Sequence, residues 1–169
     1  MSTAPGREHW LSACILSLEM NGINYTIHHG LENEGFEPAA IRWAYENCGE
    51  EFILMQDSIV VKNRAAIDRA FSHNHIHCFT NDANSFFCKF SRDALFGDLP
   101  PLPHSKKESI NVESGWMRQF VTKNKTVWEK PLLVDSGRFE TVFGERRMIL
   151  ENEWFWKCKG CWDPKMIKE

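Results

Sequence analysis

Residues 35–61, GFEPAAIRWAYENCGEEFILMQDSIVV, decide the expected fold. The stretch begins in a glycine turn, continues with helical spacing of apolar residues over 38–48, and enters an apolar run at 52–55. A near-continuous apolar run is typical of a strand that is covered on both faces. Asp57 follows this run, so it is predicted at the carboxyl end of a buried strand, where open α/β sheets bind their ligands.

The rest of the chain supplies further helices and strands around this stretch. Strands and helices alternate up to about residue 71, which predicts an α/β fold with a mostly parallel sheet flanked by helices and a less regular C-terminal half. The expected elements are a helix at 7–20, a strand at 24–28, a helix at 63–71, two strands joined by a turn at 81–84, an irregular segment at 97–109, a helix at 111–121, and a closing strand, turn and aromatic tail over 132–162.

Length and composition describe one ordinary globular domain over residues 1–169, with a first half at 1–71 and a second half at 72–169. The formal net charge of −3 gives no bulk basic field that would attract nucleic acid or an acidic membrane. No apolar run reaches the ~18 residues of a membrane span, and the first ten residues carry no hydrophobic signal region. We therefore expect a cytoplasmic protein without a membrane span.

The order of several short motifs resembles a known family. Thr3 and Arg7 form a TxxxR start, a helix ending in Ser-Leu follows, and an N-x-G motif at Asn33 and Gly35 precedes the helix and the FILMQDS run. This order resembles small nucleotide-sugar glycosyltransferases of the GT-A fold, close to family 2. The likeness is strongest over residues 3–61, although the first strand is reduced to residues 2–4.

The resemblance implies a metal site at the end of the FILM run. In that family an acidic cluster, commonly written DxD, holds a divalent metal that bridges the diphosphate of the sugar donor. A hard cation bound by carboxylate oxygens neutralises the charge that develops on the leaving diphosphate. The matching residues are Gln56, Asp57 and Ser58, so the expected ligand of Mn²⁺ or Mg²⁺ is Asp57, the single carboxylate of a degenerate motif.

The resemblance also implies residues for the donor and the acceptor. Glu113, in the helix after the proline-rich segment, matches the general base that activates the acceptor hydroxyl, and the neighbouring Trp116 is placed to stack on a sugar ring. Arg7 and Arg147 are expected to contact the donor phosphates together with Asp57. The implied reaction moves a sugar from a nucleotide diphosphate donor to a hydroxyl-bearing acceptor, which is a glycan, a small molecule or a modified nucleic acid.

Structural roles compete with these functional ones. Asp57 is also a residue type that caps helices and ends strands, and Glu113 and Arg7 are also ordinary residues for the first turn of a helix. Trp154, Phe155 and Trp156 are expected to cover the core rather than to bind sugar. One alternative function is therefore a catalytically inactive GT-A-like module for binding or assembly.

A zinc-binding protein is the other alternative. His73, His75 and His77 alternate, so in a strand they would share one face and could bind zinc. The CKGC motif at Cys158 and Cys161 is half of a typical zinc or redox site. The other cysteines lie mostly in apolar segments, which indicates small buried side chains rather than a disulfide framework.

Overall fold

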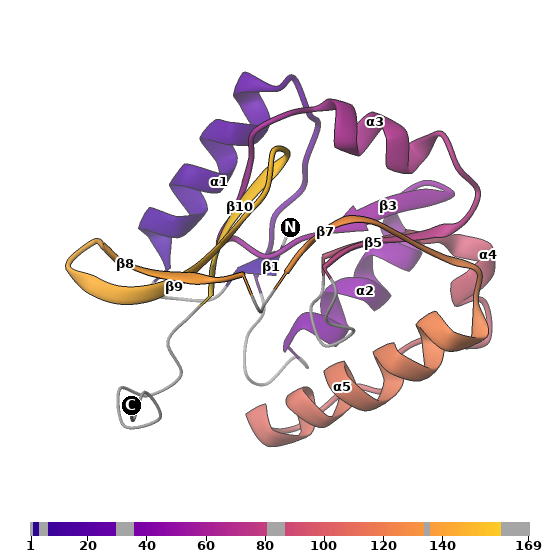
Figure 1. The fold of residues 1–169 in the computed structure, drawn as a ribbon. Coiled ribbons are helices and arrows are strands. Elements are labelled where there is room, and N and C mark those ends of the chain that lie inside the picture. Colours follow the sequence, from indigo (N-terminus) through magenta and orange to yellow (C-terminus); the bar gives the residue numbers. More distant parts are fainter. Residues whose placement is uncertain (1, 4–6, 30–35, 81–86, 134–135, 160–169) are drawn as a thin grey trace.

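The structure is a computed structural model that describes residues 2–3, 7–29, 36–80, 87–133 and 136–159. Helices and strands are mixed along the whole described chain (Figure 1). The elements in chain order are β1 (Ser2–Thr3), α1 (Glu8–Met20), β2 (His28–His29), α2 (Phe36–Asn47), β3 (Glu51–Leu54), β4 (Ile59–Val61), α3 (Ala65–Phe71), β5 (Ile76–Thr80), β6 (Cys88–Ser91), α4 (Arg92–Leu95), α5 (Lys106–Lys123), β7 (Thr126–Leu132), β8 (Arg138–Val142), β9 (Glu145–Glu151) and β10 (Phe155–Lys159).

Two sheets of four strands organise the described fold, beside a short pair formed by β1 and β2. The β3 sheet has the order β3-β6-β5-β7, and the β10 sheet has the order β4-β10-β9-β8. The chain passes from the first sheet to the second through the turn between β3 and β4, where the Ile59 amide donates to the Gln56 carbonyl at 3.2 Å. Asp57 lies inside this turn, so it stands at the junction of the two sheets.

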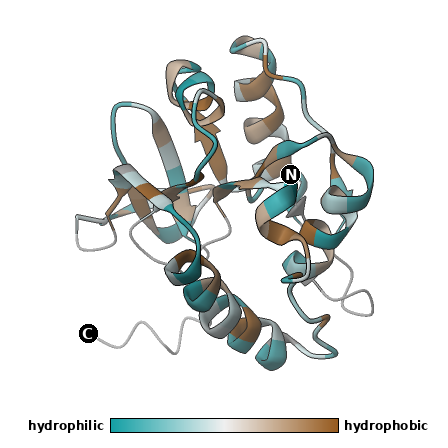
Figure 2. Cartoon of the chain, turned by 90° about the vertical axis from the view of Figure 1, so that its right-hand side faces the viewer, coloured by the Kyte–Doolittle hydropathy of each residue, from teal (hydrophilic) through white to brown (hydrophobic). Residues whose placement is uncertain are grey.

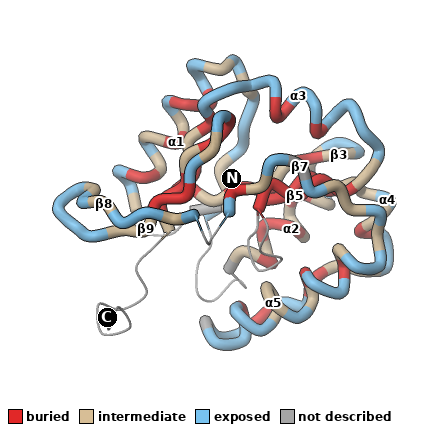
Figure 3. Tube along the Cα trace, viewed as in Figure 1, coloured by how far each residue is buried: buried red, intermediate tan, exposed pale blue. Residues whose placement is uncertain are grey.

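Helices cover both faces of the β3 sheet. Core residues of α1 and α3 pack with β4, β9 and β10 on one face, whereas α2 and α5 pack together on the opposite face. Figure 1 shows the two helix pairs on either side of the β3 sheet, and Figure 2 shows that hydrophobic and hydrophilic residues alternate along the helices. The buried tube segments of Figure 3 run through the strands at the centre, while the β8–β9 hairpin is mostly exposed.

Three phenylalanines join the β3 sheet to the β10 sheet. Phe79 of β5 and Phe87, which precedes β6, stack with ring centroids 4.6 Å apart. Phe155 of β10 meets both rings edge-on, at 5.1 Å and 4.8 Å. All three side chains are fully buried. Aromatic pairs in these geometries add about 0.5–1.5 kcal/mol beyond the burial of their area, so this cluster stabilises the contact between the sheets. The expectation that Phe155 covers the core is confirmed.

Helix α1 is attached to the outer edge of β4 by polar side chains. The Val61 amide donates to the Ser17 hydroxyl at 3.0 Å, and the Asn21 side-chain amide donates to the Val61 carbonyl at 3.0 Å. Ser17 is buried, so its hydrogen bonds also satisfy a polar group that would be costly to leave unpaired. These bonds fix the C-terminal end of α1 against the last residue of β4.

The expectation of a mostly parallel sheet is wrong. Among the described residues, five strand pairings are antiparallel, and only the β1–β2 and β5–β7 pairings are parallel. In three of the antiparallel pairings, β5–β6, β8–β9 and β9–β10, the chain returns directly beside the preceding strand, whereas β3–β6 and β4–β10 join strands that are distant in the sequence. Between β8 and β9 the turn consists of Phe143 and Gly144, whose φ angles of 52° and 80° suit the tight turn of an antiparallel hairpin. The fold is a mixed α/β fold with mostly antiparallel sheets.

The individual elements agree with expectation more closely in the first half of the chain. The helices expected at 7–20, 38–48 and 63–71 are present as α1, α2 and α3, with ends that differ by one or two residues. The strand expected at 24–28 is wrong in extent, since only β2 forms there. The expectation of an aromatic tail at the end of the closing segment is also wrong, because Phe155–Lys159 form strand β10, which pairs with β4 and β9. The turn expected at 81–84 lies outside the described residues.

The cysteines of the described chain behave as core side chains. Cys14, Cys78, Cys88 and Cys158 are buried and form no disulfide, and Cys48 is half-buried. Burial raises the pKa of Cys14 to about 12 and that of Cys88 above its ordinary value, which keeps both thiols in their neutral form. No helix among the described residues combines the length and apolar character that crossing a bilayer requires.

Replacing Phe155 by alanine tests the aromatic link between the sheets. We expect Phe155→Ala to lower the free energy of unfolding by about 3–5 kcal/mol, because a fully buried ring leaves a cavity at the junction. Phe96→Ala is the matched control, since Phe96 is 79 % exposed, and we expect a change below ~1 kcal/mol. Urea unfolding followed by tryptophan fluorescence measures both. Equal losses in the two variants would contradict the role of the cluster.

Candidate functional site

The buried carboxylate at the junction of the sheets is bound by an arginine from the start of α1. The Arg7 Nε donates to Asp57 Oδ2 at 2.7 Å and to Oδ1 at 2.9 Å, and its Nη2 donates to Oδ1 at 2.5 Å. The Asp57 side chain is 3 % exposed and the Arg7 side chain 34 % exposed. A carboxylate so far from water is stable in its charged form only when a cation and hydrogen-bond donors meet it.

Local structure explains why these two side chains meet. Asp57 lies in the turn after β3, and the carbonyl of the next residue, Ser58, accepts from the Cys158 amide of β10 at 3.0 Å. Arg7 occupies the N-cap position of α1, whose other end is fixed to β4 through Ser17 and Asn21. The segment from Asp57 to Val61 is therefore held along α1 at both ends, and Asp57 is presented toward the helix N-terminus.

The start of α1 carries positive character beyond the charge of Arg7. The cap position makes no side-chain hydrogen bond to the first turn, and the N-terminal end of a helix attracts anions through its unsatisfied amides and its dipole. The hydrogen bond that Arg7 donates to Asp57 raises the pKa of Arg7, so the guanidinium stays charged. The bonds to Asp57 use Nε and Nη2 and leave Nη1 outside the pair. This nitrogen belongs to a side chain that is still one-third exposed.

The predicted acceptor residues lie on a different helix. Glu113 and Trp116 are both half-buried on α5, over the face of the β3 sheet opposite α1. Glu113 accepts a hydrogen bond from the Ser109 hydroxyl at 3.2 Å, one helical turn earlier. The Trp116 indole donates to the Asp98 carbonyl at 3.1 Å and stacks on Phe120 with a centroid distance of 4.9 Å. Trp116 is thus packed as a structural side chain, and its role with a sugar stays a prediction.

Arg147 lies on β9 and is engaged by its own strand. Its guanidinium donates to the carboxylate of Glu145, two residues earlier. The neighbouring Arg146 lies over the ring of Phe139 on the adjacent strand β8, at 5.0 Å from the ring centroid. Contact between Arg147 and donor phosphate stays a prediction. The structure therefore joins Arg7 with Asp57, and it places Arg147 in a separate ion pair on the β10 sheet.

A divalent metal does not fit the arrangement around Asp57 as it stands. Both carboxylate oxygens of Asp57 already accept from Arg7, which supplies the positive charge that a cation would bring. Within residues 2–3, 7–29, 36–80, 87–133 and 136–159, no group of three or more His, Cys, Asp or Glu side chains is arranged to hold a metal ion. Hard divalent cations need several oxygen ligands, so a lone carboxylate bound to arginine is a poor site.

The histidines expected to share one strand face do not do so. Strand β5 begins at Ile76, so His73 and His75 precede it and only His77 lies within it. His77 is fully buried, with its ring 5.0 Å from Phe79 and 6.5 Å from the His73 ring. That prediction is wrong because the chain bends before the strand starts. In the CKGC motif Cys158 is a buried residue of β10, and Cys161 lies outside the described residues.

The sequence analysis did not predict the buried lysine Lys89, whose ammonium lies near the start of β3. The Lys89 side chain is fully buried on β6, and its ammonium donates to the Glu51 carboxylate of β3 and to the His73 carbonyl. The signal was present in the sequence, because Lys89 interrupts the apolar run Phe-Phe-Cys-Lys-Phe at 86–90. A lysine inside an apolar strand requires a partner, and the sequence could not show which carboxylate provides it.

Comparison with known protein families, with curated proteins and with solved structures gives no match for this chain.

A double-mutant cycle tests the pair at the junction. We expect Asp57→Asn to lower the free energy of unfolding by about 2–3 kcal/mol, less than the ~3–5 kcal/mol of a fully buried pair because water reaches Arg7. Arg7→Gln should destabilise as well, and the double variant should lose less than the two single losses added together. Urea denaturation of the four proteins measures the coupling energy.

The exposed pair between Arg64 and Asp68 is the control for this cycle. Arg64 is the N-cap residue of α3 and Asp68 lies within that helix, and their side chains are 52 % and 58 % exposed. We therefore expect Asp68→Asn to change stability by less than ~1 kcal/mol. A coupling energy at Arg7 and Asp57 as small as that at the control would show that the buried contact contributes nothing to the fold.

Proposed function

We propose that this chain is a glycosyltransferase that moves a sugar from a nucleotide diphosphate donor to a hydroxyl acceptor, with Arg7 binding the donor phosphates. The observation that supports this most is the guanidinium of Arg7, which Asp57 holds rigidly at the N-terminal end of α1. Charge-assisted bonds from a preorganised arginine and the amides of a helix N-terminus are suited to phosphate oxygens. The order of motifs from Thr3 to Val61, which resembles the GT-A glycosyltransferases, adds to this proposal.

The position of Asp57 in the fold agrees with a donor-binding site. Strand β3 is antiparallel to β6, and β6 is antiparallel to β5, so β3, β5 and β7 all point in one direction. The carboxyl ends of these three strands therefore lie at the same end of the β3 sheet. Asp57 follows the last residue of β3 at that end. Loops that follow strand ends of this kind commonly carry ligand sites.

The proposed reaction assigns separate roles to Arg7 and Glu113. The acceptor hydroxyl oxygen would form a bond to the anomeric carbon while the bond from that carbon to the diphosphate oxygen breaks. Because α5 carries Glu113 on the face of the β3 sheet opposite Arg7, this assignment requires donor and acceptor to meet at the common end of β3, β5 and β7. There Glu113 would take the hydroxyl proton, and Arg7 would offset the negative charge that builds on the leaving diphosphate. This displacement inverts the anomeric carbon. Dependence on Mn²⁺ or Mg²⁺ stays a prediction, because the arrangement around Asp57 fits an arginine better than a metal ion.

A module that binds without catalysis is the second candidate. It is favoured by one observation, which is that both oxygens of Asp57 are occupied by Arg7. A carboxylate in that state helps to hold α1 against the turn, and this role requires no chemistry. Turnover of a nucleotide sugar distinguishes the two candidates.

Nucleotide binding tests the donor site. We expect isothermal titration calorimetry to detect binding of at least one nucleoside diphosphate among UDP, GDP and dTDP, measured with and without Mn²⁺. The paired variant Arg7→Gln with Asp57→Asn keeps a neutral hydrogen-bonding pair, and it should weaken binding about 10- to 100-fold, as expected for the loss of a charged hydrogen bond worth ~1.5–3 kcal/mol. Arg64→Gln at the N-cap of α3 is the control and should bind like wild type. Absence of binding to every nucleotide would remove the basis of the proposal.

Transfer activity tests Glu113 separately. We expect Glu113→Gln to reduce the rate of sugar transfer or donor hydrolysis by about 10²- to 10⁴-fold, while donor affinity stays unchanged, because a general base acts on the acceptor. Glu46→Gln, at an exposed position on α2, is the control. Activity is followed by release of nucleoside diphosphate from UDP-, GDP- and dTDP-sugars. A Glu113→Gln variant as active as the control contradicts the assignment of the base.

A further inference from the structure

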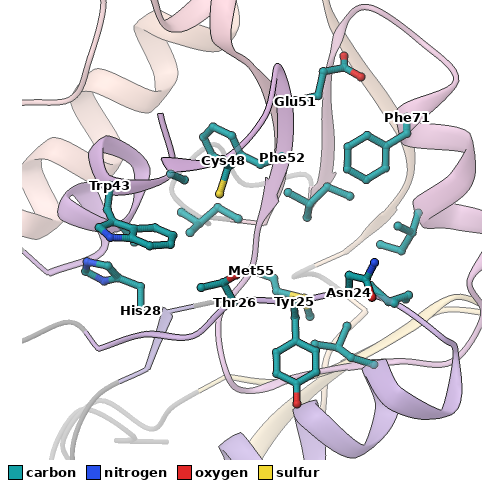
Figure 4. Close-up of a pocket in the computed structure, with 17 residues that line it drawn as sticks. Asn24, Tyr25, Thr26, His28, Trp43, Cys48, Glu51, Phe52, Met55 and Phe71 are labelled. Carbon is teal, nitrogen blue, oxygen red and sulfur yellow. The ribbon is translucent and has the colours of Figure 1, made fainter. Parts of the chain in front are cut away.

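A pocket of about 290 Å³ lies along strand β3 (Figure 4). Its walls come from the connector that precedes β2, from α2, from α3 and from every residue of β3. Protein interiors are close-packed, and one water needs only ~10–15 Å³ of such space. The pocket is therefore large enough to hold a segment of polypeptide chain.

The pocket passes through the layer of the β3 sheet. Phe52 and Leu54 of β3 belong to the core beneath α2 and α5, whereas Ile53 packs against the core beneath α1 and α3. All three line the pocket, although a cavity over one face of a sheet would meet only one of these sets. Figure 4 shows Trp43 and Phe71 on opposite sides of the strand. The pocket is thus a slot in the plane of the sheet, with apolar side chains above and below it.

The backbone of β3 faces the slot with groups that can pair with a further strand. In the part of the chain that the structure describes, β3 is the outermost strand of its sheet, beside β6. The Arg92 amide donates to the Glu50 carbonyl at 2.8 Å, and the residues of an antiparallel ladder point alternately toward and away from their partner strand. Phe52 and Leu54 therefore direct their backbone groups to β6, and Ile53 directs its amide and carbonyl into the slot. An edge of this kind is a template for another extended segment.

The parallel ladder between β1 and β2 leads directly into this slot. Ser2 pairs with His28 and Thr3 with His29. In a parallel ladder both strands run backward together, so the positions directly ahead of Ser2 stand opposite residues 24–27. Three of these residues, Asn24, Tyr25 and Thr26, line the slot. The chain traced backward from Ser2 therefore enters the slot between residues 24–27 and β3.

We propose that the slot holds a strand of this same protein, formed by about five or six residues that begin ahead of Met1 and run directly into Ser2. This strand extends β1 backward, pairs with residues 24–27 on one side and with β3 on the other, and joins β2 to the β3 sheet. Because helices cover the slot from both faces, its side chains are mainly apolar and β-branched. Its covalent connection to β1 gives it a high effective concentration at the slot. This inference is independent of sugar transfer.

The protein isolated from its source gives the first test. We expect mass spectrometry of its N-terminal peptide to find a mainly apolar segment of about five or more residues ahead of Met1. An N-terminus at Met1 or Ser2 overturns the proposal, and so does a preceding segment that is rich in charged residues, since such a segment cannot be buried on both faces.

Hydrogen exchange measured by NMR gives the second test. A valine- and isoleucine-rich segment of about six residues, with one lysine at its start for solubility, is joined ahead of Met1, and a glycine-serine segment of equal length is the control. We expect the apolar segment to slow exchange of the Ile53 amide at least tenfold relative to that of Phe52, which already faces β6. It should also raise the melting temperature by ~5 °C or more. Equal exchange of Ile53 in the two fusions overturns the proposal.

Two further proteins fix the place and the source of the strand. In the apolar fusion, Ala44→Phe fills the slot from α2 and should remove the protection of Ile53, whereas Ala65→Phe, at an exposed position on α3, should leave it unchanged. Cys48→Trp replaces Ala44→Phe if that variant unfolds by circular dichroism. Protection that survives a filled slot overturns the proposal. The same segment joined after Glu169 should give no protection, and equal protection from that position overturns the assignment to the chain ahead of Ser2.

Discussion

A carboxylate that is almost fully removed from water has to be paired, and this requirement governs how the chain is arranged around Asp57. Its partner, Arg7, comes from the beginning of α1. If α1 lay elsewhere, the carboxylate of Asp57 would be buried without this partner. Once α1 is placed, Ser17 and Asn21 meet β4, and β4 is positioned to pair with β10. One ion pair thus connects the N-terminal helix, the turn between the sheets and the last strand.

Local signals predicted the helices well and the sheets poorly. Apolar spacing placed α1, α2 and α3 because a helix buries one stripe of side chains, and that stripe can be read from the sequence. The direction of strand pairing depends on which strands become neighbours, and Val61 with Phe155 or Cys78 with Trp128 are contacts that no local pattern specifies. The short tail containing Phe155 therefore looked like a cover for the core, although it is the strand that holds the second sheet together.

The candidate site was predictable as residues but not as a contact. Asp57 was singled out because it ends an apolar run, and Arg7 because it starts a helix, yet only the folded chain joins their side chains. That contact changes the chemistry expected of Asp57, since a carboxylate that accepts from arginine with both oxygens is poorly disposed to a divalent ion. Lys89 shows the reverse case, in which the sequence displayed a charge inside an apolar strand but could not show that Glu51 would neutralise it.

The pairing of β4 with β10 also sets the order in which the chain can mature during synthesis. Val61 leaves the ribosome long before Phe155, its partner in the sheet. At ~5–20 residues per second, the intervening chain takes about 5–20 s to be made, and throughout that time one edge of β4 has no strand beside it. Contacts that join such distant residues form slowly and leave apolar edges open to aggregation. The nascent chain is therefore expected to rely on chaperones until its last strand has emerged.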